Sequence, residues 1–84
     1  PNRAPIVDTL ASALAADNQL PKAIEAQKRA IALEPKDPGM SLRLAKLYLK
    51  AGDKTLARNE LDALTRLGDK FKGQAEVAAL LKTL

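Results

Sequence analysis

The chain has 84 residues, enough for one small domain, and it contains neither cysteine nor histidine. Disulfide frameworks and thiolate metal sites are therefore excluded, and the commonest catalytic base is missing. The 14 basic and 10 acidic residues give a net charge of +4, but the two signs alternate along the chain, which is typical of solvated helix faces and argues against nucleic-acid binding.

Apolar residues make up 46% of the chain and aromatic residues only 2%, so the core must be built from Leu, Ile, Val and Ala. Strands favour β-branched and aromatic residues, and valine occurs only at Val7 and Val77. The composition therefore predicts an all-α fold. No apolar run approaches the roughly 18–20 residues that a membrane-spanning helix needs.

Proline, glycine and apolar spacing predict five helices in chain order. We expect them over about residues 5–17, 21–33, 38–51, 54–67 and 74–83. Asp37 and Asp53 are suitable N-caps for the third and fourth helices. Asn18, Gly52 and Gly68 follow apolar periodic runs, where a left-handed C-terminal residue is favoured.

The helices repeat with a period of 34 residues, without a gap. The shift aligns Leu10 with Leu44, Ala11 with Ala45, Leu14 with Tyr48, Asn18 with Gly52, Ala23 with Ala57, and Leu33 with Leu67. Small residues at the aligned alanines allow two antiparallel helices to approach closely, and the larger aligned residues fill the space beside them. A helix–turn–helix period of 34 is typical of tetratricopeptide repeats.

Over about residues 4–67 the sequence resembles the tetratricopeptide repeat family. The second repeat carries the pattern Leu44-Ala45-x-x-Tyr48-x-x-x-Gly52 followed by Ala57, and the first ends its second helix with Glu34-Pro35. Departures are Val7 and Ser41 where an early aromatic is expected, Gln27 where an aromatic is common, Leu64 in place of a small residue, and Asp69 in place of the closing proline.

The resemblance implies an α-solenoid of two helix–turn–helix hairpins plus a capping helix, wound as a right-handed superhelix. The first repeat would cover about residues 4–37, the second about 38–71 and the capping helix about 73–84, all in one domain. Because the chain begins with Pro1, we expect it to be part of a longer repeat protein. Proteins of this family are non-catalytic scaffolds that hold a peptide or a partner protein, and no cofactor is implied.

A narrower resemblance comes from three segments: Ile6–Leu10, Leu49–Lys54 with Ala57-Arg58, and the tail from Phe71 through Ala79–Leu84. They are similar to the C-terminal end of the repeat lipoproteins of bacterial exosortase (PEP-CTERM) and exopolysaccharide systems. That resemblance implies an exported, periplasmic protein that assists polysaccharide assembly or protein sorting. A small cytoplasmic adaptor is the alternative that the sequence leaves open.

The family spacing places the first helix of each pair on a concave groove. The groove positions would be Asp8, Ser12 and Ala15 from the first repeat, Leu42, Lys46, Leu49 and Lys50 from the second, and Glu76 and Leu80 from the closing helix. Leu42 and Leu49 would form an apolar strip edged by lysines, which suits a peptide with leucine-type anchors and acidic residues. The alternative is that both leucines pack against the fifth helix, which would also cover the fourth helix with Val77 and Leu81.

Other functions fit the residues less well. A carboxylate clamp of the chaperone-binding kind is not met, since the corresponding positions are Asp8, Ser12, Arg43 and Lys46. Carboxylates are scattered beside Lys or Arg, so neither a catalytic pair nor a metal site is predicted. An acidic polymer, such as a polysaccharide or nucleic acid, could bind through Lys46, Lys50, Lys54 and Arg58.

The outer face of the first helix is the last candidate surface. Without a preceding helix, Ile6, Leu10 and Ala13 would be exposed or would be covered by a second copy of the chain. We therefore expect self-association through this helix.

Overall fold

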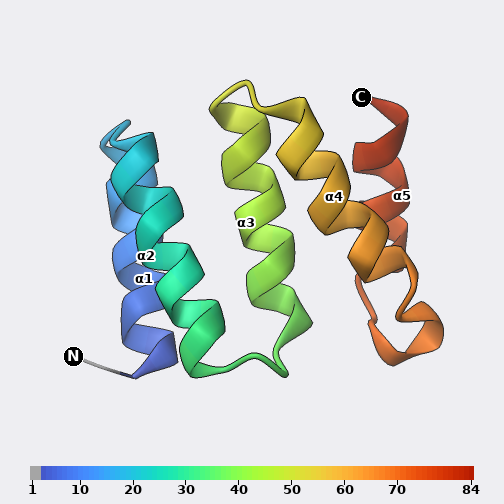
Figure 1. The fold of residues 1–84 in the computed structure, drawn as a ribbon, viewed down its shortest axis with the longest axis horizontal. Coiled ribbons are helices and arrows are strands. Elements are labelled where there is room, and N and C mark those ends of the chain that lie inside the picture. The colour runs from blue at the N-terminus through green and yellow to red at the C-terminus, as the bar shows by residue number, and fades with distance from the viewer. Residues whose placement is uncertain (1–2) are drawn as a thin grey trace.

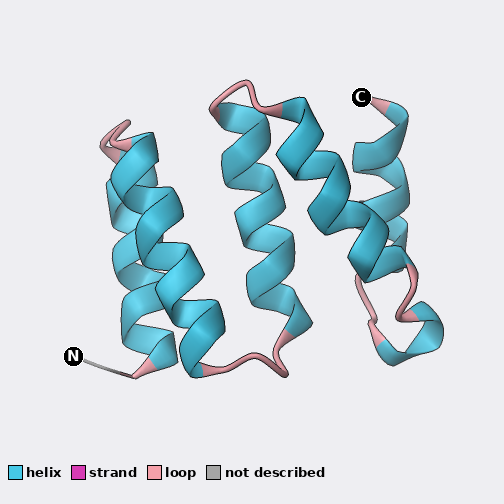
Figure 2. Ribbon diagram, viewed as in Figure 1, coloured by secondary structure: helices cyan, strands magenta, loops and turns pink. Residues whose placement is uncertain are grey.

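The computed structural model describes residues 3–84, and over that range the fold is entirely helical (Figures 1 and 2). Helices α1 (Ala4–Ala16) and α2 (Leu20–Leu33) form the first hairpin, and α3 (Pro38–Lys50) and α4 (Lys54–Thr65) form the second. A 3-10 turn at Gly68–Lys70 then leads into α5 (Gln74–Lys82). The five expected helices are confirmed within about two residues at each end, whereas the 3-10 turn was not predicted.

The helix ends follow from local chemistry. Asp37 caps α3 by accepting a hydrogen bond from the Gly39 N–H at 3.0 Å, and Asp53 caps α4 through the Leu56 N–H at 3.1 Å. Asn18 has a φ of 59° and Gly52 a φ of 84°. Both lie in the left-handed region that reverses the chain after a helix, so each hairpin turn has the residue type that its backbone requires.

Buried alanines lie where the two helices of each hairpin pack together. Ala11, Ala23, Ala45 and Ala57 are between 0 and 1% exposed, as the repeat pattern predicted. Small side chains at these positions let the two helices of each hairpin approach closely, and larger neighbours such as Leu61 and Tyr48 fill the space around them.

The hairpins join where α3 packs on α2. Met40 of α3 lies in a buried cluster with Ala26 and Ala30 of α2. Gln27 is 1% exposed, and its Nε2 donates to the Met40 carbonyl at 3.0 Å. The Lys28 Nζ lies 5.9 Å from the centre of the Tyr48 ring, within cation–π range. A buried amide thus occupies the position where the family commonly has an aromatic, and it links the repeats by a hydrogen bond.

Helix α5 covers the far side of the second hairpin. Val77 is fully buried and packs with Leu61 and Leu64 of α4, and Leu81 packs against the same cluster. The Gln74 Nε2 donates to the carbonyls of Leu64 at 2.6 Å and Gly68 at 3.1 Å. This side chain satisfies acceptors at the end of α4 and fixes the start of α5, and the prediction that Val77 and Leu81 cover α4 is confirmed.

Candidate functional site

Helix α3 makes polar side-chain contacts with both α1 and α5. Arg43 bonds Asp8 of α1 at 2.8 Å (Nη1 to Oδ2), and Lys46 forms an ion pair with Glu76 of α5. The Lys50 Nζ donates to the carbonyl of Ala15 at 3.3 Å. Three cations therefore follow one side of α3, at spacings of three and four residues that place them on a single helix face.

These contacts border a groove between α1 and α3, with a volume of about 340 Å³. We call it the α1–α3 groove, and its lining residues are Ser12, Ala15, Ala16, Gln27, Arg43, Lys46, Leu47 and Lys50. Of the residues that the sequence assigned to a groove, Ser12, Ala15, Lys46 and Lys50 come together here. Asp8 and Glu76 do not line it, but each bonds a cation that does.

The expectation that Leu42 lies exposed in the groove is wrong. Leu42 is only 7% exposed and packs with Leu61, Leu64 and Val77, because α5 covers this side of α3. Leu80 of α5, also expected in the groove, is partly buried against the same cluster.

Leu49 has a different environment from Leu42. It is partly buried and packs on the cluster that contains Leu44, Tyr48 and Ala57. The apolar strip predicted from Leu42 and Leu49 therefore does not exist as an open surface, and the groove is more basic than the sequence suggested.

Sequence reasoning missed Arg43 and Leu47 as groove residues, and Ala16 and Gln27 with them. Arg43 had been considered only for the carboxylate clamp. The available signal was the spacing of Arg43, Lys46 and Lys50, which lie at i, i+3 and i+7 on one helix. The family positions select Leu42, one residue earlier, and a one-residue step rotates a side chain by about 100° around the helix.

The Asp8 carboxylate is held asymmetrically. Its Oδ2 accepts from Arg43, while its Oδ1 is buried and has no hydrogen-bond partner among the described residues. The Asp8 side chain is 17% exposed and the Arg43 side chain 51%. Exposed ion pairs typically contribute about 0–1 kcal/mol, but breaking this one would leave the largely buried Asp8 carboxylate without a partner, which costs about 1–3 kcal/mol or more.

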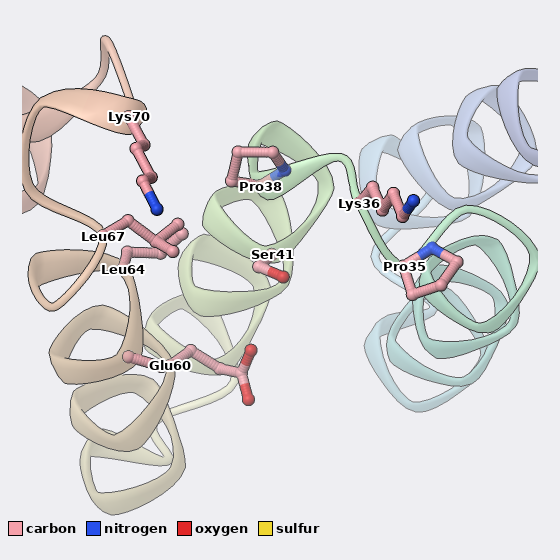
Figure 3. Close-up of a pocket in the computed structure, with 9 residues that line it drawn as sticks. Pro35, Lys36, Pro38, Ser41, Glu60, Leu64, Leu67 and Lys70 are labelled. Atoms are coloured by element: carbon pink, nitrogen blue, oxygen red, sulfur yellow. The ribbon is translucent and has the colours of Figure 1, made fainter.

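A second and larger cavity, of about 640 Å³, lies between the loop that joins α2 to α3, the start of α3, and α4 with the 3-10 turn that follows it (Figure 3). We call it the α2–α4 cleft, and it is lined by Pro35, Lys36, Pro38, Ser41, Glu60, Ala63, Leu64, Leu67 and Lys70. Figure 3 shows Lys70 and Glu60 at opposite ends, with Leu64 and Leu67 between them. Burial raises the pKa of Glu60 above its ordinary value, and the nearby Lys28 partly opposes that rise.

The remaining candidate residues lie outside both cavities. Ile6 and Leu10 are 53% and 48% exposed on α1, and Ala13 is exposed on the same helix. Lys54 and Arg58 are exposed on α4. In residues 3–84 there is no group of three or more acidic, histidine or cysteine side chains that could hold a metal ion, and no helix of that range has the length and apolar character needed to cross a membrane.

The fold is an α-solenoid of consecutive helical hairpins, with the first helices bordering an open groove. Residues 9–84 match the model of the tetratricopeptide repeat family, and the chain belongs to that family. No curated protein and no solved structure matches it. Tetratricopeptide repeats are protein–protein interaction scaffolds and are typically non-catalytic.

Proposed function

We propose that the chain is a non-catalytic module that holds an acidic segment of a partner protein in the α1–α3 groove. The observation that supports this function is the row of three cations, Arg43, Lys46 and Lys50, on the groove side of α3. Their present partners are Asp8, Glu76 and a backbone carbonyl, all within the chain. A peptide carboxylate would meet a site whose positive charges are already placed.

Exchange of partners is energetically feasible. The Lys46 and Glu76 side chains are 46% and 48% exposed, and such pairs add little net stability because water screens them. A bound peptide can replace Glu76 and also remove Lys46 from solvent, which strengthens the new contact. Ala15, Ala16 and Leu47 provide a small apolar floor, sufficient to anchor one aliphatic side chain of the peptide.

The proposal is tested by selecting random 12-residue peptides on the immobilised chain and measuring their affinity by fluorescence polarisation. Two matched variants distinguish the cavities: Lys46→Ala/Lys50→Ala in the groove, and Lys36→Ala/Lys70→Ala in the α2–α4 cleft. Each removes two positive charges, so general electrostatic attraction falls equally in both. We expect the selected peptides to be rich in acidic residues. They should bind the groove variant about tenfold or more weakly than the unmodified chain, since two charge-assisted contacts disappear.

The cleft variant, Lys36→Ala/Lys70→Ala, is the control, and it should change peptide affinity by less than about threefold. If the cleft variant weakens binding and the groove variant does not, peptides occupy the α2–α4 cleft and the groove assignment is refuted. The apolar Leu64 and Leu67 in that cleft make this a genuine competitor.

Binding of an acidic polymer through Lys46, Lys50, Lys54 and Arg58 is the rival function. It predicts that polyglutamate or heparin binds, and that affinity falls steeply with salt as counterions are released. A peptide anchored partly by apolar contacts loses less affinity over the same salt range. Titrations between 50 and 200 mM salt separate the two functions.

The biological setting stays a proposal drawn from resemblance. The likeness of the Leu49–Lys54 segment and the Leu-rich tail to exosortase-system repeat lipoproteins favours an exported, periplasmic protein that assists exopolysaccharide assembly or protein sorting. The alternative is a cytoplasmic adaptor. Sequencing the parent reading frame tests this: an export signal followed by upstream repeats supports the periplasmic assignment, and its absence from the full frame supports the adaptor.

A further inference from the structure

Gln27 is an unusual residue for its place in the fold. Within residues 3–84 it is the one amide or charged side chain that is buried, with an exposure of 1%. The equivalent residue of the second repeat, 34 positions later, is Leu61, which is fully buried in the core. An amide at a repeat position that the other hairpin fills with leucine departs from the pattern of the fold, and such departures are expected mainly at functional sites.

The two polar atoms of the Gln27 amide have different surroundings. The Nε2 donates to the Met40 carbonyl, and this bond fixes the orientation of the amide because only its nitrogen can donate. The Oε1 accepts no hydrogen bond from residues 3–84, yet in that range Asp8 Oδ1 is the only side-chain atom that is both fully buried and without a partner. The Gln27 Oε1 therefore keeps contact with solvent, and the cavity that Gln27 lines is the α1–α3 groove.

This acceptor lies in a groove whose other inner residues are small and apolar. Ala15, Ala16 and Leu47 line it together with Gln27. A peptide side chain with a hydrocarbon tip would displace solvent from the Gln27 Oε1 and leave the oxygen without a hydrogen bond, which weakens binding by about tenfold or more. A tip that donates a hydrogen bond avoids this loss. A positively charged donor is disfavoured, because the three groove cations on α3 would repel it.

We propose that the Gln27 Oε1 accepts a hydrogen bond from the peptide side chain that enters the α1–α3 groove, so that the groove selects a neutral donor at this position. The donor is a hydroxyl or an amide on a short apolar stem, in a peptide segment whose other residues are mainly acidic. This inference rests on the proposed function and specifies the anchor: its aliphatic stem packs on Ala15, Ala16 and Leu47, and its tip bonds Gln27. A site built around a hydrogen bond discriminates more strongly than a purely apolar pocket does.

Paired peptides test the selection of a donor. The probe is a selected 12-residue peptide that binds the unmodified chain and is weakened by Lys46→Ala/Lys50→Ala. At each of its positions threonine is compared with valine, and glutamine with methionine, because each pair is similar in size and only the first member donates a hydrogen bond. At one position we expect the donor to bind about tenfold more tightly than its partner, measured by fluorescence polarisation.

Variants of the chain assign that preference to one residue. Gln27→Met keeps the length of the side chain and removes both polar atoms, so the members of the pair should then bind within about threefold of each other. Gln27→Leu, which copies Leu61, is a second variant with the same expected result. Ser12→Ala is the matched control, since Ser12 is the other neutral polar residue that lines the groove and its hydroxyl donates to the Asp8 carbonyl at 3.3 Å. It should leave the tenfold preference intact.

Circular dichroism at 222 nm selects a temperature at which each variant is folded, so lost stability cannot imitate lost recognition. The role of Gln27 is overturned if no position prefers the donor, if the preference persists in the Gln27 variants, or if Ser12→Ala removes it. A peptide that depends on Lys46 and Lys50 but shows no preference refutes this role and leaves the proposed function standing. If no selected peptide depends on those lysines, the proposed function fails and the role of Gln27 fails with it.

Discussion

The Leu42→Ala variant tests whether Leu42 belongs to the core beneath α5. Leu42 is 7% exposed and contacts a cluster with Ala45, Leu61, Leu64 and Val77. Removing its isobutyl group loses the transfer free energy and leaves a cavity, and such replacements cost about 2–5 kcal/mol. A chain of this length is stabilised by only about 4–13 kcal/mol in total, so the variant loses a large part of its stability.

Leu49→Ala is the matched control, because it removes the same atoms from the same helix. Leu49 is only partly buried, so we expect a cost of about 1–2 kcal/mol, compared with about 3 kcal/mol for Leu42. For a small domain 1 kcal/mol shifts the melting temperature by about 4–8 °C. Leu42→Ala should therefore melt roughly 12–24 °C below the unmodified chain, and Leu49→Ala roughly 4–16 °C below it.

The assay is thermal and urea unfolding followed by circular dichroism at 222 nm, with peptide affinity measured at a temperature where both variants are folded. We expect groove affinity to survive Leu42→Ala, because the residue does not line the groove. Equal shifts for the two variants, or a shift below about 3 °C for Leu42→Ala, would refute the burial argument. Lost peptide binding in a folded Leu42→Ala variant would return Leu42 to the binding surface.

Three further predictions concern single side chains. Burial raises the pKa of Glu60 above its ordinary value of 4.5, so the folded state binds that proton more tightly than the unfolded chain and stability falls as pH rises through this region. The Glu60→Gln variant should therefore melt at a higher temperature than the unmodified chain at pH 7. This difference in melting temperature should disappear near pH 4. Gln27→Ala removes the bond to the Met40 carbonyl and leaves a void, so urea unfolding should show a loss of about 2–3 kcal/mol, and a loss below 0.5 kcal/mol would contradict the role of this amide in joining the repeats. Asp53→Ala removes the cap of α4 and should cost about 1 kcal/mol, visible as a melting temperature lower by about 4–8 °C.

The helices, their caps and the packing of each hairpin could be predicted because they depend on local chemistry. A left-handed residue at Asn18 or Gly52 and a carboxylate at Asp53 act within a few residues of themselves. The contacts of the hairpin alanines are also local, because they join two helices that are consecutive in the sequence and belong to the same tetratricopeptide repeat. These features need only the spacing of residue types and the 34-residue period.

The groove was harder to predict because it depends on how α5 lies across α3. Leu42 and Arg43 are adjacent in sequence, yet one is buried under α5 and the other lines the groove. Which of the two residues is exposed to solvent depends on the position of α5. Gln74 and Val77 fix that position through contacts that are distant in sequence from Leu42 and Arg43. The α2–α4 cleft has the same origin, since it forms only once two separate hairpins and the 3-10 turn come together.

Leu10 and Leu44 show what a repeat sequence can and cannot specify. They are the same residue at the same repeat position, yet one is 48% exposed and the other 4%. The period therefore fixes which face of a helix is built for contact, while the neighbouring helix determines whether that face becomes core or surface. In α3 the neighbour is α2. In α1 the same face is exposed among the described residues. A repeat position that is core in one hairpin and exposed in the next is thus a place to look for an interface.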